Sequence, residues 1–183
     1  KSKQPITYRL QKWILGNTFL TKNIKVLVYG NWPKQSKNIF PFFTASYQKN
    51  EIEEIPKKDF KSKINLLFVG AFSRGKQPLL SVKAAHKLIK RGHNISLDMY
   101  GNGSEFIKIE KYINDNELYK DIKLHGNESK EIVKQAFQKS HFLVFISKSE
   151  GWPKVVAESM FWSCLVVSTK VSCVPFMLED GNR

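Results

Sequence analysis

The chain has 183 residues, of which 42% are hydrophobic and 13% aromatic, a composition that excludes an intrinsically disordered chain and predicts a globular core. Its formal net charge is +14, but only four of the 30 basic residues are arginine, which disfavours a protein that reads nucleic acid through bidentate arginine contacts. The two cysteines, Cys164 and Cys173, exclude a disulfide framework and are typical of buried thiols in a reducing cytoplasm.

The first third of the chain is basic and carries few regular patterns. Residues 1–63 contain 13 basic and 4 acidic residues. A helix is predicted over Ile6–Leu15 and a strand over Ile24–Tyr29, whereas Phe40-Pro41 is expected to interrupt regular structure and residues 49–63 resemble a charged linker. Such a basic excess suits a membrane surface, nucleic acid or an anionic substrate, although a solvated lysine-rich surface is the plainer interpretation.

From residue 64 onward, apolar runs alternate with helical patterns. The runs predict five strands, over Ile64–Val69, Ile95–Tyr100, Ile122–His125, His141–Ile146 and Leu165–Ser168. The helical patterns cover Leu79–Lys90, a segment capped by Ser104 and ending near Asn114, a segment capped by Ser129 and ending near Lys139, and Lys154–Trp162. This alternation predicts βαβ units and an α/β fold with a Rossmann-like, doubly wound parallel sheet.

Ligands bind such sheets beyond the carboxyl ends of the strands. The segments that follow the strands there are polar or contain glycine: Gly70–Lys76, Gly101–Ser104, Gly126–Ser129 and Ser147–Gly151. In the first, glycines, a helix start, Arg74 and Lys76 would suit a phosphate. The segment has neither P-loop nor dinucleotide-binding spacing, however, and a surface turn explains it about as well. Gly101 and Gly103 permit close approach of a ligand, but a tight turn explains them at least as well.

Two glutamates stand out near the same edge of the predicted sheet. Glu150 follows a strand and Glu158 lies eight residues later, inside the next helix. Both carboxylates could accept hydrogen bonds from sugar hydroxyls, or each could be a structural group bonded to backbone N–H. Of the four histidines only His125 ends a strand at this edge, and their spacing predicts no metal site.

At this point the chain from about residue 64 to 183 resembles the C-terminal, donor-binding domain of the retaining GT-B glycosyltransferases of group 1, or family 4. Four motifs carry the resemblance, in order: Phe68-Val69-Gly70…Ser73…Lys76; Tyr100-Gly101-Asn102-Gly103-Ser104-Glu105; Leu124-His125-Gly126-Asn127; and Glu150-Gly151-Trp152…Glu158-Ser159-Met160. The last matches the family's glutamate pair with seven residues between. Ala71 stands where the family often has arginine, so Arg74 would have to reach the donor from a different position.

The resemblance implies a role for each matched position. Lys76 would contact the donor diphosphate, Glu150 the hydroxyls of the transferred sugar, and Glu158 the ribose hydroxyls, with Lys76 and Glu150 as the catalytic pair. The other donor-binding positions that it implies are Gly70, Arg74, Gly101, Gly103, His125, Asn127, Gly151, Trp152 and Val155. The donor would be a nucleotide sugar whose anomeric configuration is retained, with no metal and no further cofactor.

A GT-B enzyme has two such domains, with the acceptor bound between them. By resemblance, residues 1–63 are the tail end of an N-terminal acceptor domain plus a linker, and residues 64–183 are a nucleotide-sugar-binding domain truncated at its end. We therefore expect a fragment of a cytoplasmic hexosyltransferase of surface polysaccharide or glycolipid synthesis that is inactive alone. Its partners would be a nucleotide sugar, an acceptor glycan or glycolipid bound by the missing domain, and an anionic membrane at the inner face, with no nucleic acid.

Two alternatives remain open at this level. A non-catalytic basic module on the same fold, binding RNA or anionic lipid, would explain the charge of +14 but not the glutamate pair. An epimerase of the GT-B fold that acts on a nucleotide sugar is a nearer rival, and the Glu-Gly-Trp arrangement at Glu150 fits a transferase better.

Overall fold

The computed structural model describes residues 5–29, 36–44, 46–55 and 57–182. The chain forms two compact units, Lys1–Thr44 and Ala45–Arg183, and each is described by itself. The residues between this division and the predicted boundary at 63/64 belong to the second unit by their contacts. That residues 1–63 are the tail of an acceptor domain stays a prediction, because contacts within the chain do not test it.

The first unit contains the predicted helix and strand and one further strand. Helix α1 spans Ile6–Gly16 and buries none of its residues, and strand β1 (Val26–Tyr29) pairs in parallel with β2 (Ile39–Phe42). The prediction that Phe40-Pro41 interrupts regular structure is wrong. In the described residues β2 has one neighbouring strand, so the missing N–H of Pro41 can face away from the ladder.

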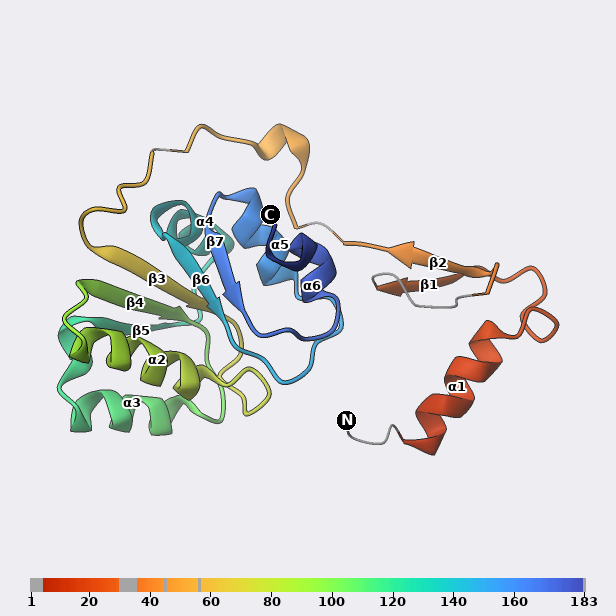
Figure 1. Ribbon diagram of the computed structural model, residues 1–183, viewed down its shortest axis with the longest axis horizontal. Coiled ribbons are helices and arrows are strands. Elements are labelled where there is room, and N and C mark those ends of the chain that lie inside the picture. The colour runs from red at the N-terminus through yellow and green to blue at the C-terminus, as the bar shows by residue number, and fades with distance from the viewer. Residues whose placement is uncertain (1–4, 30–35, 45, 56, 183) are drawn as a thin grey trace. The chain divides into compact units, whose positions relative to one another are not determined.

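The second unit is built on a parallel sheet of five strands, as predicted. The strands are β3 (Ile64–Val69), β4 (Ile95–Tyr100), β5 (Ile122–Gly126), β6 (Phe142–Phe145) and β7 (Leu165–Ser168), and their order is β5-β4-β3-β6-β7 (Figure 1). The chain winds outward from β3 to β5 and then crosses over to β6, so the winding direction reverses between β3 and β6. This reversal confirms the doubly wound fold.

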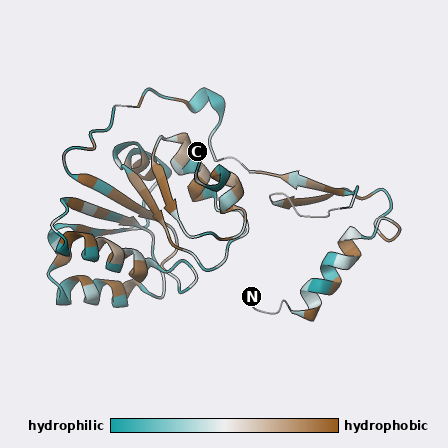
Figure 2. Ribbon diagram, in the orientation of Figure 1, coloured by the Kyte–Doolittle hydropathy of each residue, from teal (hydrophilic) through white to brown (hydrophobic). Residues whose placement is uncertain are grey.

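Helices cover the two faces of this sheet and build a separate core on each. Leu66 and Phe68 of β3 pack with α2 (Pro78–Lys90) and α3 (Phe106–Asp115), while Leu67, between them, packs with α4 (Lys130–Lys139) and α5 (Lys154–Phe161). Figure 2 shows the hydrophobic residues gathered on the five strands. A short helix, α6, and three 3-10 turns complete the unit: Val174–Met177, Lys49–Glu51, Leu118–Lys120 and Glu179–Gly181.

The starts of α3 and α4 and the two cysteines agree only in part with what the sequence predicts. Ser129 caps α4 as predicted, since its side chain accepts a hydrogen bond from the Ile132 N–H at 3.3 Å. Ser104 does not cap α3; the residue before that helix is Glu105, which has no side-chain cap bond. Cys164 and Cys173 are free and buried, as predicted, and burial raises the pKa of both thiols.

The segment predicted as a charged linker is fastened to the second unit by a lysine and a histidine. The Lys58 ammonium donates to the carbonyls of Phe137 (3.2 Å) and Ser140 (2.5 Å) at the end of α4, and to that of Ser163 (2.8 Å) after α5. His141 Nδ1 accepts from the Asn65 N–H at 2.9 Å, so its Nε2, 3.0 Å from the Asp59 carbonyl, is the donor there. Burial lowers the pKa of Lys58. Residues 57–63 are therefore an ordered strap along the domain.

The loops after β3 and β4 pack backbone against backbone. Gly70 N–H donates to the Tyr100 carbonyl at 2.9 Å, and Phe72 N–H donates to the Asn102 carbonyl at 2.9 Å. A Cβ on Gly101, whose φ is +136°, would lie 2.0 Å from the Gly70 oxygen, and one on Gly103 (φ +154°) would lie 2.7 Å from the Phe72 oxygen. These two glycines are thus required by the fold itself.

We expect the Lys58→Met variant to lower the free energy of unfolding by about 2 kcal/mol, because three carbonyls lose a charged donor. The exposed neighbour Lys57 is the matched control, and Lys57→Met should change stability by no more than about 0.5 kcal/mol. Urea unfolding followed by circular dichroism measures both. Equal effects of the two variants would contradict a specific role for Lys58.

Gly101→Ala should lower the free energy of unfolding by at least about 2 kcal/mol, since it adds both a strained φ and a clash with backbone. Gly151→Ala is its control, because a Cβ there meets nothing within 4 Å. The same urea titration compares them, and a fully stable Gly101→Ala protein would show that the two loops can separate without cost.

Candidate functional site

The segments after β3 and β6 meet where the winding of the sheet reverses. Since β3 and β6 are parallel neighbours, their carboxyl ends lie at the same edge, and the loops that follow them are brought together (Figure 1). Lys76 lies on the first loop and Glu150 on the second. The Lys76 Nζ is 2.7 Å from Glu150 Oε1, so the fold pairs the two predicted catalytic residues directly.

Glu150 is a nearly buried carboxylate with one oxygen held by the protein. Its side chain is 9% exposed. Oε1 receives both the Lys76 ammonium and the hydroxyl of Ser147, which is 2.6 Å away. In the described part of the chain Oε2 has no hydrogen-bond partner. One oxygen therefore fixes the carboxylate, and the other keeps its lone pairs for an incoming hydroxyl group.

Ser147 joins the loop after β6 to its neighbours on both sides. Its N–H donates to the Thr169 hydroxyl at 3.1 Å, and that hydroxyl donates to the Ser147 carbonyl at 2.9 Å. The Gly75 carbonyl accepts from the Lys148 N–H at 2.9 Å, which ties this loop to the loop that carries Lys76. The positions of Lys76 and Glu150 are thus set by backbone bonds as well as by their own contact. Sequence reasoning missed Ser147 and Thr169 because their roles depend on contacts between distant segments.

Gly70 and Arg74 lie on the first loop but in different surroundings. Gly70 has a φ of +148°, and a Cβ built there would meet no atom within 4 Å, so the side of Gly70 on which a side chain would stand is open. Arg74 is 92% exposed, and its Nε is 3.6 Å from Glu105 Oε1, while the other oxygen of that carboxylate, Oε2, lies 3.5 Å from the Lys108 ammonium. The structure therefore places Arg74 beside α3 rather than in the Lys76–Glu150 pair.

At the end of β5, His125 belongs to a small cluster that the sequence analysis did not predict. Its Nε2 is 2.6 Å from Asp98 Oδ1, and its ring stacks on Tyr100 with centroids 4.5 Å apart and planes at 7°. Burial, and then the carboxylates of Asp98 and Glu128, raise the pKa of the Tyr100 hydroxyl. Asp98 and Tyr100 are alternate residues of β4, so their shared face was the available signal. Asn127 is exposed in the loop that follows.

The remaining predicted positions lie on and before α5. Glu158 is half-buried, and its carboxylate has no hydrogen bond or ion pair to another described residue; its charge acts on the nearby Tyr47. Within the described residues, the carboxylate of Glu158 is therefore not bonded to a backbone N–H group. Val155 and Trp152 are half-buried and pack against the core. Gly151 is exposed, and its carbonyl accepts from the Ser172 hydroxyl at 3.1 Å.

Among the residues that the structure describes, no group of three or more His, Cys, Asp or Glu side chains is placed to hold a metal ion. None of the described helices is both long enough and apolar enough to cross a bilayer. What the edge of the sheet offers chemically is a cation, a carboxylate oxygen without a partner and exposed loop backbone.

Known proteins share this arrangement of elements. A mutant of TarM from Staphylococcus aureus, crystallised with fondaparinux, α-GlcNAc-glycerol and UDP, superposes with a TM-score of 0.71 at 21% identity, over 93% of this chain and 34% of that chain. A likeness at this identity shows the fold, and it confirms one half of a GT-B architecture.

The chain is also similar in sequence to curated glycosyltransferases. An uncharacterised glycosyltransferase of Methanocaldococcus jannaschii is 32% identical over 115 residues, which are 63% of this chain and 31% of the relative. The capsular polysaccharide biosynthesis glycosyltransferase CapH of Staphylococcus aureus is 27% identical over 146 residues, which are 76% of this chain and 38% of the relative. The chain thus spans about a third of the length of these relatives.

The family model described as "Glycosyl transferases group 1" matches residues 49–183, which include the whole five-stranded sheet and the strap before it. The matched region also contains every residue of the Lys76–Glu150 site. The chain therefore belongs to the group 1 glycosyltransferases, as the sequence motifs predicted.

Proposed function

We propose that the edge of the sheet around Lys76 and Glu150 binds the nucleotide-sugar donor of a glycosyltransferase that transfers a hexose with retention of configuration. One observation carries the proposal: a cation suited to a diphosphate lies 2.7 Å from a carboxylate suited to sugar hydroxyls, at the switch point of the sheet. The transferred sugar and the diphosphate are neighbours in every nucleoside-diphosphate sugar, so a site that takes both needs these two groups side by side.

In this proposal Lys76 keeps its contact with Glu150 and gains a second anion when the donor binds. Without donor its ammonium is paired with Glu150; with donor it contacts the diphosphate as well, where negative charge builds up when the bond to the sugar breaks. Because no atom lies within 4 Å of where a Gly70 side chain would stand, the phosphates have room beside the loop. A pre-positioned cation at the leaving group stabilises the transition state without reorganisation of the site.

Glu150 orients the sugar and is not a nucleophile in this proposal. Because Ser147 and Lys76 hold Oε1, Oε2 can accept a hydrogen bond from a sugar hydroxyl in a fixed direction. Glu158, half-buried and without a described ion-pair partner, would hold the ribose hydroxyls. The positions left to complete the donor site are Arg74, Gly101, Gly103, His125, Asn127, Gly151, Trp152 and Val155.

The relatives suggest the donor and the pathway. A UDP-sugar is supported by the UDP named with the TarM structure, and surface polysaccharide or glycolipid synthesis is supported by the name of CapH. The acceptor, a glycan or glycolipid, would be bound by a domain outside these 183 residues, in a cytoplasmic enzyme at the inner face of the membrane. The proposal requires no metal or cofactor besides the donor, and it predicts no sugar transfer by this chain alone.

Saturation-transfer NMR on the 183-residue chain, with UDP-, GDP- and ADP-sugars, tests the donor site. We expect signals from the UDP-sugar, and at least about tenfold weaker affinity in Glu158→Ala and in the double variant Lys76→Gln/Glu150→Gln, which removes both charges of the pair together. Lys139→Gln removes an exposed charge at the far end of α4 and should leave affinity unchanged.

Circular dichroism of each variant checks that it is folded. Equal affinity in the folded charge-pair variant and the wild type would contradict the assignment of Lys76 and Glu150. No binding of any nucleotide sugar by the folded wild-type chain would contradict the donor site as a whole. Transfer of sugar by the purified chain would contradict the prediction that it is inactive alone.

A further inference from the structure

The first unit carries a one-sided charge. Residues 1–44 contain eight lysine or arginine residues and no aspartate or glutamate, whereas the rest of the chain contains 22 basic and 16 acidic residues. The cations of this unit therefore cannot be neutralised by acidic side chains of the same unit. A surface with this charge attracts a polyanion. The shape and the apolar residues of the surface indicate whether that polyanion is a nucleic acid or an anionic bilayer.

Helix α1 presents an exposed apolar face. Ile6, Leu10, Trp13 and Ile14 recur at helical spacing, which places them along one side of the helix. Ile6 is 82% exposed and Trp13 is 60% exposed. Basic residues on the same helix, with an exposed tryptophan, are typical of helices that lie in the interface of a bilayer.

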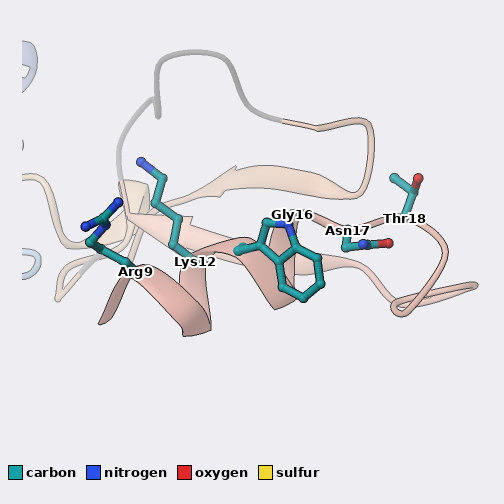
Figure 3. A pocket seen from close by; sticks show the side chains of 6 residues that line it. Arg9, Lys12, Gly16, Asn17 and Thr18 are labelled. Atoms are coloured by element: carbon teal, nitrogen blue, oxygen red, sulfur yellow. The ribbon is translucent and has the colours of Figure 1, made fainter. Parts of the chain in front are cut away.

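A hollow of about 710 Å³ lies where α1 ends, and it is lined by Arg9, Lys12, Trp13, Gly16, Asn17 and Thr18 (Figure 3). Figure 3 shows Arg9 and Lys12 projecting from the same side of the helix, with Asn17 and Thr18 contributed by the turn that follows. Two cations, an amide and a hydroxyl group are hydrogen-bond donors for phosphate oxygens. The chemistry of the hollow therefore suits a phosphate-bearing group.

The turn beside this hollow exposes another large apolar residue. The Asn17 side chain accepts from the N–H groups of Phe19 (3.0 Å) and Leu20 (3.2 Å), which fixes the turn. Phe19 lies in this turn and is 86% exposed, and Lys22, three residues later in the chain, is also exposed. An exposed phenylalanine next to cations and other exposed apolar residues is typical of a surface that binds a partner with an apolar part.

We infer that this surface, made of α1 and the turn 17–22, docks on an anionic bilayer, with a lipid phosphate in the hollow and Trp13 and Phe19 among the headgroups. The inference deepens the membrane contact named under the proposed function and rests on it. A nucleic acid could use the charge and stack bases on Trp13 and Phe19, but it would not use the exposed aliphatic side chains of α1. Lysine also dominates over arginine in this unit, so a bilayer is favoured.

Sedimentation of the whole chain with vesicles tests the inference. Vesicles of phosphatidylcholine alone are compared with vesicles that also contain phosphatidylglycerol, and we expect binding to the anionic ones. The Arg9→Gln/Lys12→Gln variant should bind the anionic vesicles at least about tenfold more weakly than the wild type. Lys87→Gln/Lys139→Gln removes two exposed cations from the second unit, has the same net charge, and should bind as the wild type does.

Phe19→Ser separates a bilayer from other anions. It should weaken vesicle binding severalfold while leaving the binding of soluble glycerol phosphate unchanged, because that anion has no apolar part for Phe19 to contact. The inference is overturned if both charge variants lose equally, if Phe19→Ser has no effect on vesicles, or if no vesicle binds because the apolar face packs against another polypeptide. It is also overturned if soluble glycerol phosphate binds in the hollow but vesicles do not.

Nucleotide-sugar binding measured on the same variants keeps the two proposals apart. Arg9, Lys12 and Phe19 lie outside the donor site, so their substitution should leave the NMR signals of the nucleotide sugar unchanged. Loss of vesicle binding with intact donor binding, or the reverse, identifies which proposal has failed.

Discussion

The ion pair between Lys76 and Glu150 depends on a topological constraint. Parallel strands cannot be joined by tight turns, so each connection leaves the carboxyl edge through a loop and returns through a helix. Only where the winding reverses do two loops diverge from adjacent strands, and here these are the loops after β3 and β6. The alternating side chains of β3 support this edge from both faces, because Leu66 and Leu67 anchor different cores. The two loops of the site are therefore anchored at the centre of the sheet.

The elements of the second unit and the places of its functional residues could be predicted from the sequence wherever they depend on periodicity and local motifs. All five strands of the sheet and the four longer helices of the second unit follow from apolar patterns, because a buried parallel strand is continuously apolar and an amphipathic helix repeats every three to four residues. The loop positions of Lys76 and Glu150 follow from where the strands end. Sequence reasoning went wrong where local preference was overruled, as at Pro41, which lies in a strand despite its missing N–H.

What could not be predicted are side-chain contacts between segments distant in the chain. The bonds of Ser147 with Thr169, of Lys58 with three carbonyls, and of His125 with Asp98 have no local signature, since any serine, lysine or histidine can make them. The same is true of the glycines. The sequence around Gly101 suits either a ligand loop or a tight turn. Only the structure shows that the fold requires glycine there, because a Cβ on this residue would lie 2.0 Å from the Gly70 oxygen.

The Lys58 clamp has a consequence for how the second unit opens. One ammonium group binds the carbonyls of Phe137 and Ser140 at the end of α4 and the carbonyl of Ser163 in the turn that follows α5. Release of the strap would free both places in the same event, so we expect the end of α4, the turn after α5 and residues 57–63 to open together. Because α5 also carries Glu158, thermal fluctuation at the amino edge of the sheet is coupled to the helix that faces its carboxyl edge.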